Sequence, residues 1–135
     1  METTKLKEQF IENINRTVAD LINDFFTANK PIATIGSGIL MLFHAFNKDI
    51  WLFNKFNLTG ISISEECRDT HFSHLPFLIE ESVRELNGNF VYQNNSNQSF
   101  VTVDKNVICG QNDSALMMVI NNFCFLINKG FLYNI

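Results

Sequence analysis

The stretch Pro31–Phe46 constrains the fold of this chain most strongly, because it joins two apolar runs through the turn Gly36-Ser37-Gly38. The first run, Ile32–Ile35, has the character of a short buried strand, and the second predicts a buried helix that Ser37 caps. In α/β proteins such a strand-to-helix turn carries ligands and nucleophiles, since backbone N–H groups at the helix start point into it. The turn is therefore the candidate site of any chemistry.

Composition limits the class of protein. The 135 residues are 46% hydrophobic, which suits one globular domain with a packed core. A net charge of −4 without a basic cluster argues against a nucleic-acid partner. The charged amino terminus does not resemble a signal peptide, and the uncharged run 31–47 is too short for a membrane span. Three cysteines without a CxxC pair favour reduced thiols in a cytoplasmic protein.

Periodicity and turn signals predict alternating helices and strands. A long amphipathic helix over about 4–28 places Leu6, Phe10, Ile14, Val18, Leu21 and Phe25 on one stripe, and Asn29 and Pro31 end it. Further helices are expected over 75–86 and 114–128, the last capped by Asn112 or Asp113 and ended by Gly130, with a helical turn at 64–66. Strands are expected at 58–63, 90–92, 100–103 and 107–109, the last two joined by a hairpin turn. This order is α/β, yet it begins with a helix where a complete doubly wound domain begins with a strand.

Several side chains of types that often act in catalysis or metal binding are expected to have only structural roles here. His44 is expected to be a core histidine, and Cys109 and Cys124 are expected to be packed. Acidic neighbours should keep Cys67 unreactive, and Glu80, Glu81 and Glu85 should form the solvated face of their helix. His71 and His74 lie beside Asp69, but no matching spacing elsewhere supports a metal site, so none is expected.

A series of collinear motifs resembles the class I glutamine amidotransferase-like superfamily, which includes PfpI-type proteases and the Parkinson-disease-7 proteins. Residues 30–38 read Lys-Pro-Ile-Ala-Thr-Ile-Gly-Ser-Gly, where members typically read Lys-Pro-x-Ala-x-x-Cys-His-Gly. The likeness continues through 58–60, 75–81, 101–106 and 109–112, and covers about residues 14–128. It implies a flavodoxin-like sheet flanked by helices that lacks its amino-terminal strands. Residues 1–135 would then form a single partial domain, with the helix at about 4–28, the turn region at 31–46 and the remainder at 50–129.

The departures from the family pattern fall at the reactive positions. The family's nucleophilic cysteine aligns with Gly36 and the histidine after it aligns with Ser37. Thiolate chemistry needs a sulfur at this turn, so the resemblance implies a pseudoenzyme without a catalytic residue. Close members form homo-oligomers and join endosome-linked assemblies. The resemblance therefore implies a cytoplasmic interaction subunit of an oligomeric complex, with early endosomes as a place of association.

Two further readings of the turn stay open. In the first, the chain is a hydrolase or deglycase of the same superfamily that uses Ser37 or Cys67 as a substitute nucleophile, although Gly36-Ser37-Gly38 is not a Gly-x-Ser-x-Gly elbow. In the second, the turn keeps a ligand-binding role, in which Ser37 and Gly38, with Gln111 and Asn112, hold a small anion or carboxylate. No cofactor is expected, because Met41 replaces the third glycine of a dinucleotide fingerprint.

The absent amino-terminal strands have a physical consequence. Without them the strand Ile32–Ile35 would lie at an open edge of the sheet and expose apolar surface beside it. Such edges drive association unless something covers them. The sequence therefore predicts an unpaired edge at this strand.

Overall fold

The computed structural model describes residues 2–133, with side chains described for residues 12–130 apart from residue 14. In chain order the elements are α1 (Glu2–Thr27), β1 (Ile32–Ile35), η1 (Gly36–His44), β2 (Phe46–Asn47), β3 (Ile50–Trp51), β4 (Asn57–Leu58), α2 (Ile63–Glu66), η2 (Phe72–His74), α3 (Ile79–Glu85), β5 (Asn89–Phe90), β6 (Val101–Asp104), β7 (Val107–Gly110), η3 (Asp113–Ala115) and α4 (Leu116–Tyr133). The elements η1, η2 and η3 are 3₁₀ helices. The predicted α/β class is confirmed. No helix in the described range is long and apolar enough to cross a membrane.

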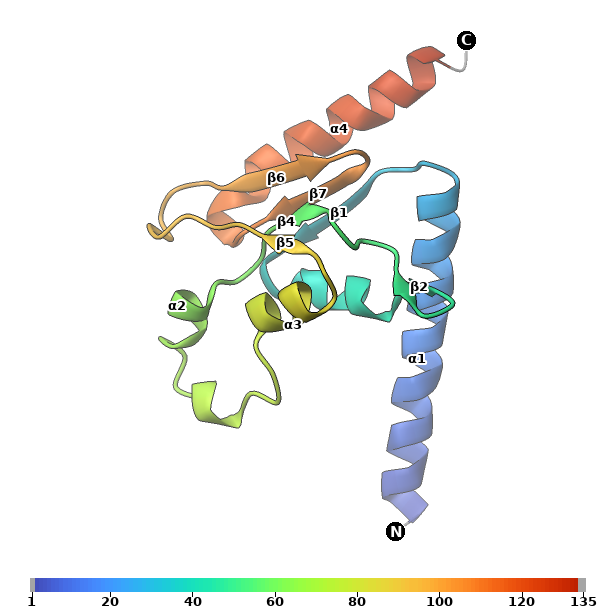
Figure 1. The fold of residues 1–135 in the computed structure, drawn as a ribbon, viewed down its shortest axis with the longest axis vertical. Coiled ribbons are helices and arrows are strands. Elements are labelled where there is room, and N and C mark those ends of the chain that lie inside the picture. The colour runs from blue at the N-terminus through green and yellow to red at the C-terminus, as the bar shows by residue number, and fades with distance from the viewer. Residues whose placement is uncertain (1, 134–135) are drawn as a thin grey trace.

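The main sheet has the order β1-β7-β6 (Figure 1). β1 pairs with β7 in parallel, with Thr34 opposite Cys109, and β6 pairs with β7 antiparallel, with Thr102 opposite the same cysteine. β4 and β5 form a separate parallel pair, and β2 and β3 form a short antiparallel hairpin. Within the described residues β1 therefore has a partner on one side only, which confirms the predicted open edge.

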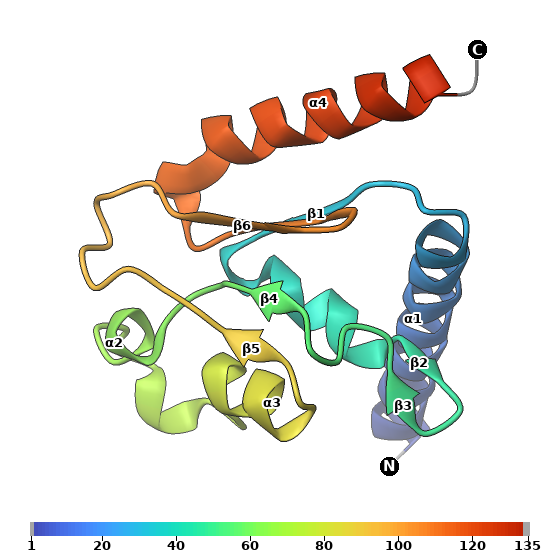
Figure 2. The ribbon, with the colours of Figure 1, turned by 45° about the horizontal axis from the view of Figure 1, so that its top comes forward.

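Helix α4 covers one face of this sheet, while η1, β4, β5 and α3 lie on the other (Figure 2). The close approach of α4 to β7 depends on Gly110. A Cβ atom at this position would come within 2.7 Å of Val119 Cγ2 and 3.0 Å of the Ala115 Cβ. Because neither neighbour is the far end of a flexible side chain, only glycine allows the helix to lie this close to the strand.

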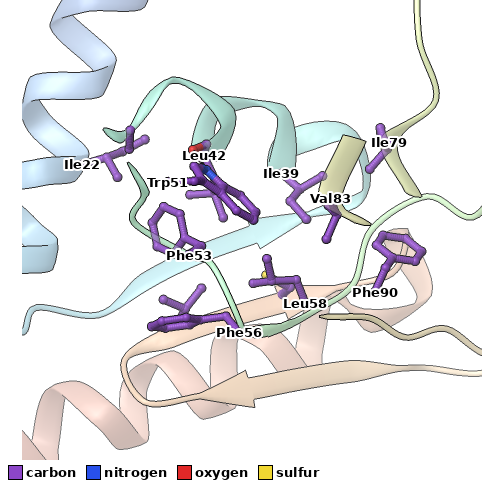
Figure 3. Packing of buried hydrophobic residues seen from close by; sticks show 13 residues of the cluster. Ile22, Ile39, Leu42, Trp51, Phe53, Phe56, Leu58, Ile79, Val83 and Phe90 are labelled. Atoms are coloured by element: carbon purple, nitrogen blue, oxygen red, sulfur yellow. Dashed lines mark hydrogen bonds between the residues drawn. The ribbon is translucent and has the colours of Figure 1, made fainter. Parts of the chain in front are cut away.

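The larger core lies on the η1 face of the sheet and is rich in aromatic side chains (Figure 3). Phe53 is fully buried at its centre, and its ring meets those of Phe26, Trp51 and Phe56 at centroid distances of 5.4, 5.6 and 5.7 Å. The indole Nε1–H of Trp51 donates to the Leu42 carbonyl at 2.7 Å, so this buried polar group is satisfied. The segment between η1 and β4 therefore anchors η1 against α1.

The first helix ends as the sequence predicts. Asn29 adopts a φ of 53°, and the N–H of Lys30 donates to the carbonyl of Phe25 at 2.9 Å. This left-handed residue closes the helix just before Pro31. On the predicted stripe, the side chains of Leu6, Phe10 and Ile14 lie outside the described residues, while Leu21 and Phe25 are exposed.

Several predicted elements have different boundaries. Ser37 does not cap a helix, because the helix after β1 is 3₁₀, begins at Gly36 and has Ile35 at its N-cap without a side-chain hydrogen bond. The strand expected at 58–63 is only Asn57–Leu58, since a capping box at Ser62 starts α2. The helix expected at 75–86 begins at Ile79, which leaves Pro76 outside it and Phe77 exposed. The β2–β3 hairpin was not predicted.

The final helix and some single residues also differ from expectation. α4 continues past Gly130 to Tyr133, because Gly130 does not adopt the left-handed φ with which a glycine ends a helix. Of its expected core face, Val119 is buried, whereas Leu116, Ile120 and Ile127 are exposed. His44 and Cys124 are exposed rather than packed, since both lie on the outer side of their helices. Glu80 is buried and its carboxylate pairs with Arg84 at 2.9 Å, so only Glu81 and Glu85 are solvated.

Candidate functional site

The tip of the strand-to-helix turn is formed by Gly36, which adopts a left-handed φ of 58°. A Cβ atom there would lie 3.4 Å from Cγ1 of Ile61 and 3.9 Å from the carbonyl oxygen of Gln111. Gly60 packs against the same turn, since its own Cβ would meet the Gly36 carbonyl oxygen at 3.0 Å. The turn thus keeps the sharp geometry expected of it, but it presents no side chain at its tip.

None of the three cysteines occupies this tip. Cys109 is fully buried on β7, between its register partners Thr34 and Thr102. Burial raises the pKa of the Cys109 thiol, and the neighbouring threonine side chains offset only part of this effect. Cys67 and Cys124 are exposed, on the loop after α2 and on α4 respectively. Cys109 therefore fits the structural role predicted for it.

A cavity of about 470 Å³ opens beside the turn. Its polar lining comes from Ser37, Glu65, Glu66, Asp69 and Asn112, and its apolar lining from Leu40, Ile61, Leu75, Pro76, Phe77 and Ile79. The structure thus brings two predicted residues, Ser37 and Asn112, to one cavity. Gly38 and Gln111 do not line it.

Glu65, one of the residues that line the cavity, is the centre of a hydrogen-bond network. Its Oε2 accepts from the backbone N–H of Ser62 at 3.0 Å and from Nε2 of Gln111 at 2.8 Å, while its Oε1 accepts from Nδ2 of Asn112. Burial disfavours the charged form, but these hydrogen bonds outweigh it and hold the pKa of Glu65 below its ordinary value. Glu65 is therefore an ionised anchor that joins α2 to the loop before α4.

Gln111 has no free amide group to offer a ligand. The side chain is 1% exposed, its Oε1 accepts from the N–H of Gln93 at 2.8 Å, and its Nε2 donates to the Gln93 carbonyl at 3.0 Å as well as to Glu65. Asn112 caps η3 by accepting from the N–H of Ser114 at 3.0 Å, which confirms the predicted cap. Both residues hold the cavity wall in place.

Glu66 differs from its neighbour Glu65. It is 9% exposed, and its Oε2 has no hydrogen-bond partner among the described residues. Burial and the nearby charge of Glu80 raise the pKa of Glu66, and a hydrogen bond from the N–H of Ile79 offsets only part of the rise. Sequence reasoning missed both glutamates as site residues. The Ser62-x-x-Glu65 capping-box pattern was the signal that could have placed the first.

The chemistry of the lining favours a cationic or neutral group over an anion, because Glu65, Glu66 and Asp69 all face the cavity. The binding of a small anion or carboxylate at Ser37 and Gly38 stays a prediction. His71 lies outside the lining and contacts Asp69 Oδ1 through Nδ1 at 3.2 Å. Within the described part of the chain, no three His, Cys, Asp or Glu side chains lie together as metal ligands would.

Comparison with known proteins finds curated relatives that all carry the same name. The chain is 31% identical over 111 residues to the human protein "Glutamine amidotransferase-like class 1 domain-containing protein 1", a match over 82% of this chain and 50% of the human one. The zebrafish (Danio rerio) protein of the same name is 27% identical over 113 residues, which is 84% of this chain and 53% of that protein. The chain thus spans about half the length of the curated relatives it matches. No family model matches it.

The fold agrees with this relationship. The crystal structure of the Rapid Encystment Protein 24 kDa from Francisella tularensis superimposes with a TM-score of 0.76 at 22% identity, over 81% of this chain and 48% of that one. Such a likeness shows the fold alone. Together, the sequence matches and the shared fold show that this chain belongs with the glutamine amidotransferase-like class 1 domain proteins and has a PfpI-like α/β fold.

Proposed function

We propose that the chain is a non-catalytic member of this superfamily that acts as an interaction subunit of an oligomeric complex. One observation carries the proposal: Gly36 occupies the tip of the turn with a left-handed φ of 58° and supplies no side chain there. A nucleophile at this tip would have the helix N-terminus behind it to stabilise a thiolate. Glycine supplies none, so the proposal assigns the turn a structural role.

The alternative is a hydrolase or deglycase that uses Ser37 as its nucleophile, and one observation favours it. Ser37 is exposed and lines the acidic cavity. A serine of this kind needs a general base, and among the described residues no hydrogen bond joins the Ser37 hydroxyl to Glu65, Glu66 or Asp69, the carboxylates that share its cavity. No histidine is among the residues that line this cavity in the described structure. The non-catalytic proposal is therefore preferred.

The interaction role is supported by apolar surface that a solitary domain would bury. Leu21 and Phe25 of α1 and Ile120 of α4 are 57%, 37% and 43% exposed, and all three line one groove beside β1. Contiguous apolar patches of this kind mark association surfaces. We propose a cytoplasmic homo-oligomer that joins a larger complex associated with early endosomes.

The proposal is tested with purified protein and its Ser37→Ala variant. Amide, ester and glyoxal-type substrates should give the same background rate with both proteins. Turnover by the wild type that Ser37→Ala abolishes would show that the alternative is right.

Sedimentation of the wild type should show an assembly larger than one chain, and a strict monomer at micromolar concentration would contradict the oligomer. Fractionation of cells should place part of the protein with early endosomes, and its absence there would contradict that association.

A further inference from the structure

The cavity beside the strand-to-helix turn combines an acidic and an apolar lining. It measures about 470 Å³ and is lined by residues of the turn, of α2 and of the loop before α3 (Figure 1). The acidic part is Glu65, Glu66 and Asp69, and the apolar part includes Phe77, which is 48% exposed. A cavity of this size and lining suits a small ligand with one polar and one apolar end.

The negative charge of the lining has no basic counterpart within it. In the described structure none of the lining residues is Lys, Arg or His. Glu65 is ionised, and its carboxylate already accepts hydrogen bonds from Ser62, Gln111 and Asn112. Glu65 therefore adds negative charge to the cavity while its hydrogen bonds are used within the protein.

Glu66 brings an acceptor that is not used in this way. It is 9% exposed, and its Oε2 has no hydrogen-bond partner among the described residues. Buried acceptors in folded proteins are nearly always satisfied, so an unpaired one calls for a physical reason. Burial and the charge of Glu80 also raise the pKa of Glu66, which means that its surroundings stabilise the ionised form poorly. A cation with N–H donors would supply both missing interactions.

Other classes of ligand fit this lining less well. An anion would meet three carboxylates, and a wholly apolar molecule would desolvate them without a partner. A hard metal ion prefers a shell of oxygen ligands, but much of the lining is apolar, and no three acidic, His or Cys side chains of the described residues are grouped as ligands. A primary ammonium group has one positive charge and three N–H donors.

We propose that the cavity binds a primary ammonium group on an apolar stem, with the ammonium at Glu66 and Asp69 and the stem against Phe77. The inference goes beyond the proposed function and does not rest on it, since such binding needs no nucleophile. Free alkylamines have this chemistry, and so does the lysine side chain of a partner protein. The binding of a small anion or carboxylate at the turn, expected from the sequence, is the opposing hypothesis.

The probe is hexylammonium, titrated into the purified full-length chain at neutral pH and followed by the NMR chemical shifts of the backbone amides. Three compounds with the same stem are the controls: hexanoate reverses the charge, hexanol removes it, and hexyltrimethylammonium keeps it without an N–H donor. Hexanoate and hexanol should bind roughly tenfold more weakly or worse, and hexyltrimethylammonium several-fold more weakly. The shifts caused by hexylammonium should be largest around Ser37, Glu66 and Phe77.

Two variants separate the ends of the ligand. Glu66→Gln removes the buried charge and should weaken hexylammonium binding by roughly tenfold. Since this variant is expected to be more stable than the wild type at neutral pH, loss of binding would not reflect unfolding. Phe77→Ala should weaken the binding of hexylammonium more than that of ethylammonium, which has little stem to pack. Glu85→Gln, exposed and outside the cavity lining, should bind like the wild type.

A lysine derivative with both backbone ends capped identifies the source of the ammonium group. Tighter binding than hexylammonium indicates a lysine side chain and weaker binding a free amine, and either result supports the ligand chemistry. No hexylammonium binding up to about 10 mM, equal or tighter binding of hexanoate or hexanol, or unchanged binding by Glu66→Gln overturns the inference. Turnover that Ser37→Ala abolishes would overturn the proposed function but leave these binding results unchanged, so the two failures are distinguishable.

Discussion

Gln111 donates a hydrogen bond through Nε2 to Oε2 of Glu65 at 2.8 Å, and this contact joins the loop before α4 to the start of α2. The two residues are far apart in the sequence, and of the two only Glu65 lines the cavity. Asn112 contacts the other oxygen of the same carboxylate. The shape of the cavity beside the turn therefore depends on one ionised glutamate.

Glu65→Gln should destabilise the fold at neutral pH by about 1–3 kcal/mol, because one carboxylate oxygen becomes an amide that faces donors. The pKa of Glu65 lies below its ordinary value in the folded state, so its stabilisation is present at neutral pH and is lost as the pH falls through the folded pKa. Urea unfolding at pH 7 and pH 3 checks this, with exposed Glu81→Gln as the control. A loss of equal size at both pH values would argue against the ionised network.

Glu66→Gln should have the opposite effect. The pKa of Glu66 is raised in the folded state, so the unfolded chain ionises first and wild-type stability declines as the pH rises from about 4.5 through the folded pKa. Glutamine removes the ionisation, and the melting temperature at pH 7 should rise by roughly 2–5 °C, with no gain below pH 4. Glu85→Gln, which is exposed, is the matched control. A lower melting temperature for Glu66→Gln at pH 7 would contradict the assignment.

Gly36→Ala should destabilise the fold by about 1–2 kcal/mol, because alanine is strained at a φ of 58°. Gly38→Ala is the comparison, since its φ is ordinary and its Cβ would lie 3.8 Å from the Cβ of Thr34. It should change stability by less than about 0.5 kcal/mol. Denaturant unfolding measures the free energy of unfolding of both variants. Equal losses would mean that the left-handed φ of Gly36 does not strain an alanine there.

Phe53→Ala should cost about 3–5 kcal/mol, because it leaves a cavity among three neighbouring aromatic rings. Phe125→Ala removes a ring that is 65% exposed and should be close to neutral. Thermal unfolding distinguishes the two. Near-equal losses would place the centre of the core elsewhere.

The sequence predicted those parts of the fold that local signals control. Asn29 and Pro31 located the end of α1, and the hairpin of β6 and β7 followed from two apolar runs around a polar turn. These features depend on residues close together in the chain. The open edge of β1 was predicted differently, from the amino-terminal strands that the resemblance implies the chain to lack.

Features set by tertiary contacts were missed. The exposure of His44 and the burial of Glu80 depend on which helix face meets the core, and apolar periodicity is ambiguous where a helix is hydrophobic on most faces. Glu65 acquires its role through Gln111 and Asn112, which are distant in sequence, so a local pattern could predict its cap but not its network. For this reason the sequence predicted Ser37 and Asn112 as residues of the candidate cavity but missed Glu65.

The most direct test of a non-catalytic turn is the reactivity of its side chains in the native protein. Purified protein is treated with fluorophosphonate and iodoacetamide probes, and labelled residues are mapped by mass spectrometry in native and denatured samples. The account predicts no fluorophosphonate label on Ser37, and thiol labelling of Cys67 and Cys124 that is no faster in the native protein than in the denatured one. Labelling of Ser37 or Cys67 that is faster in the native state would contradict it.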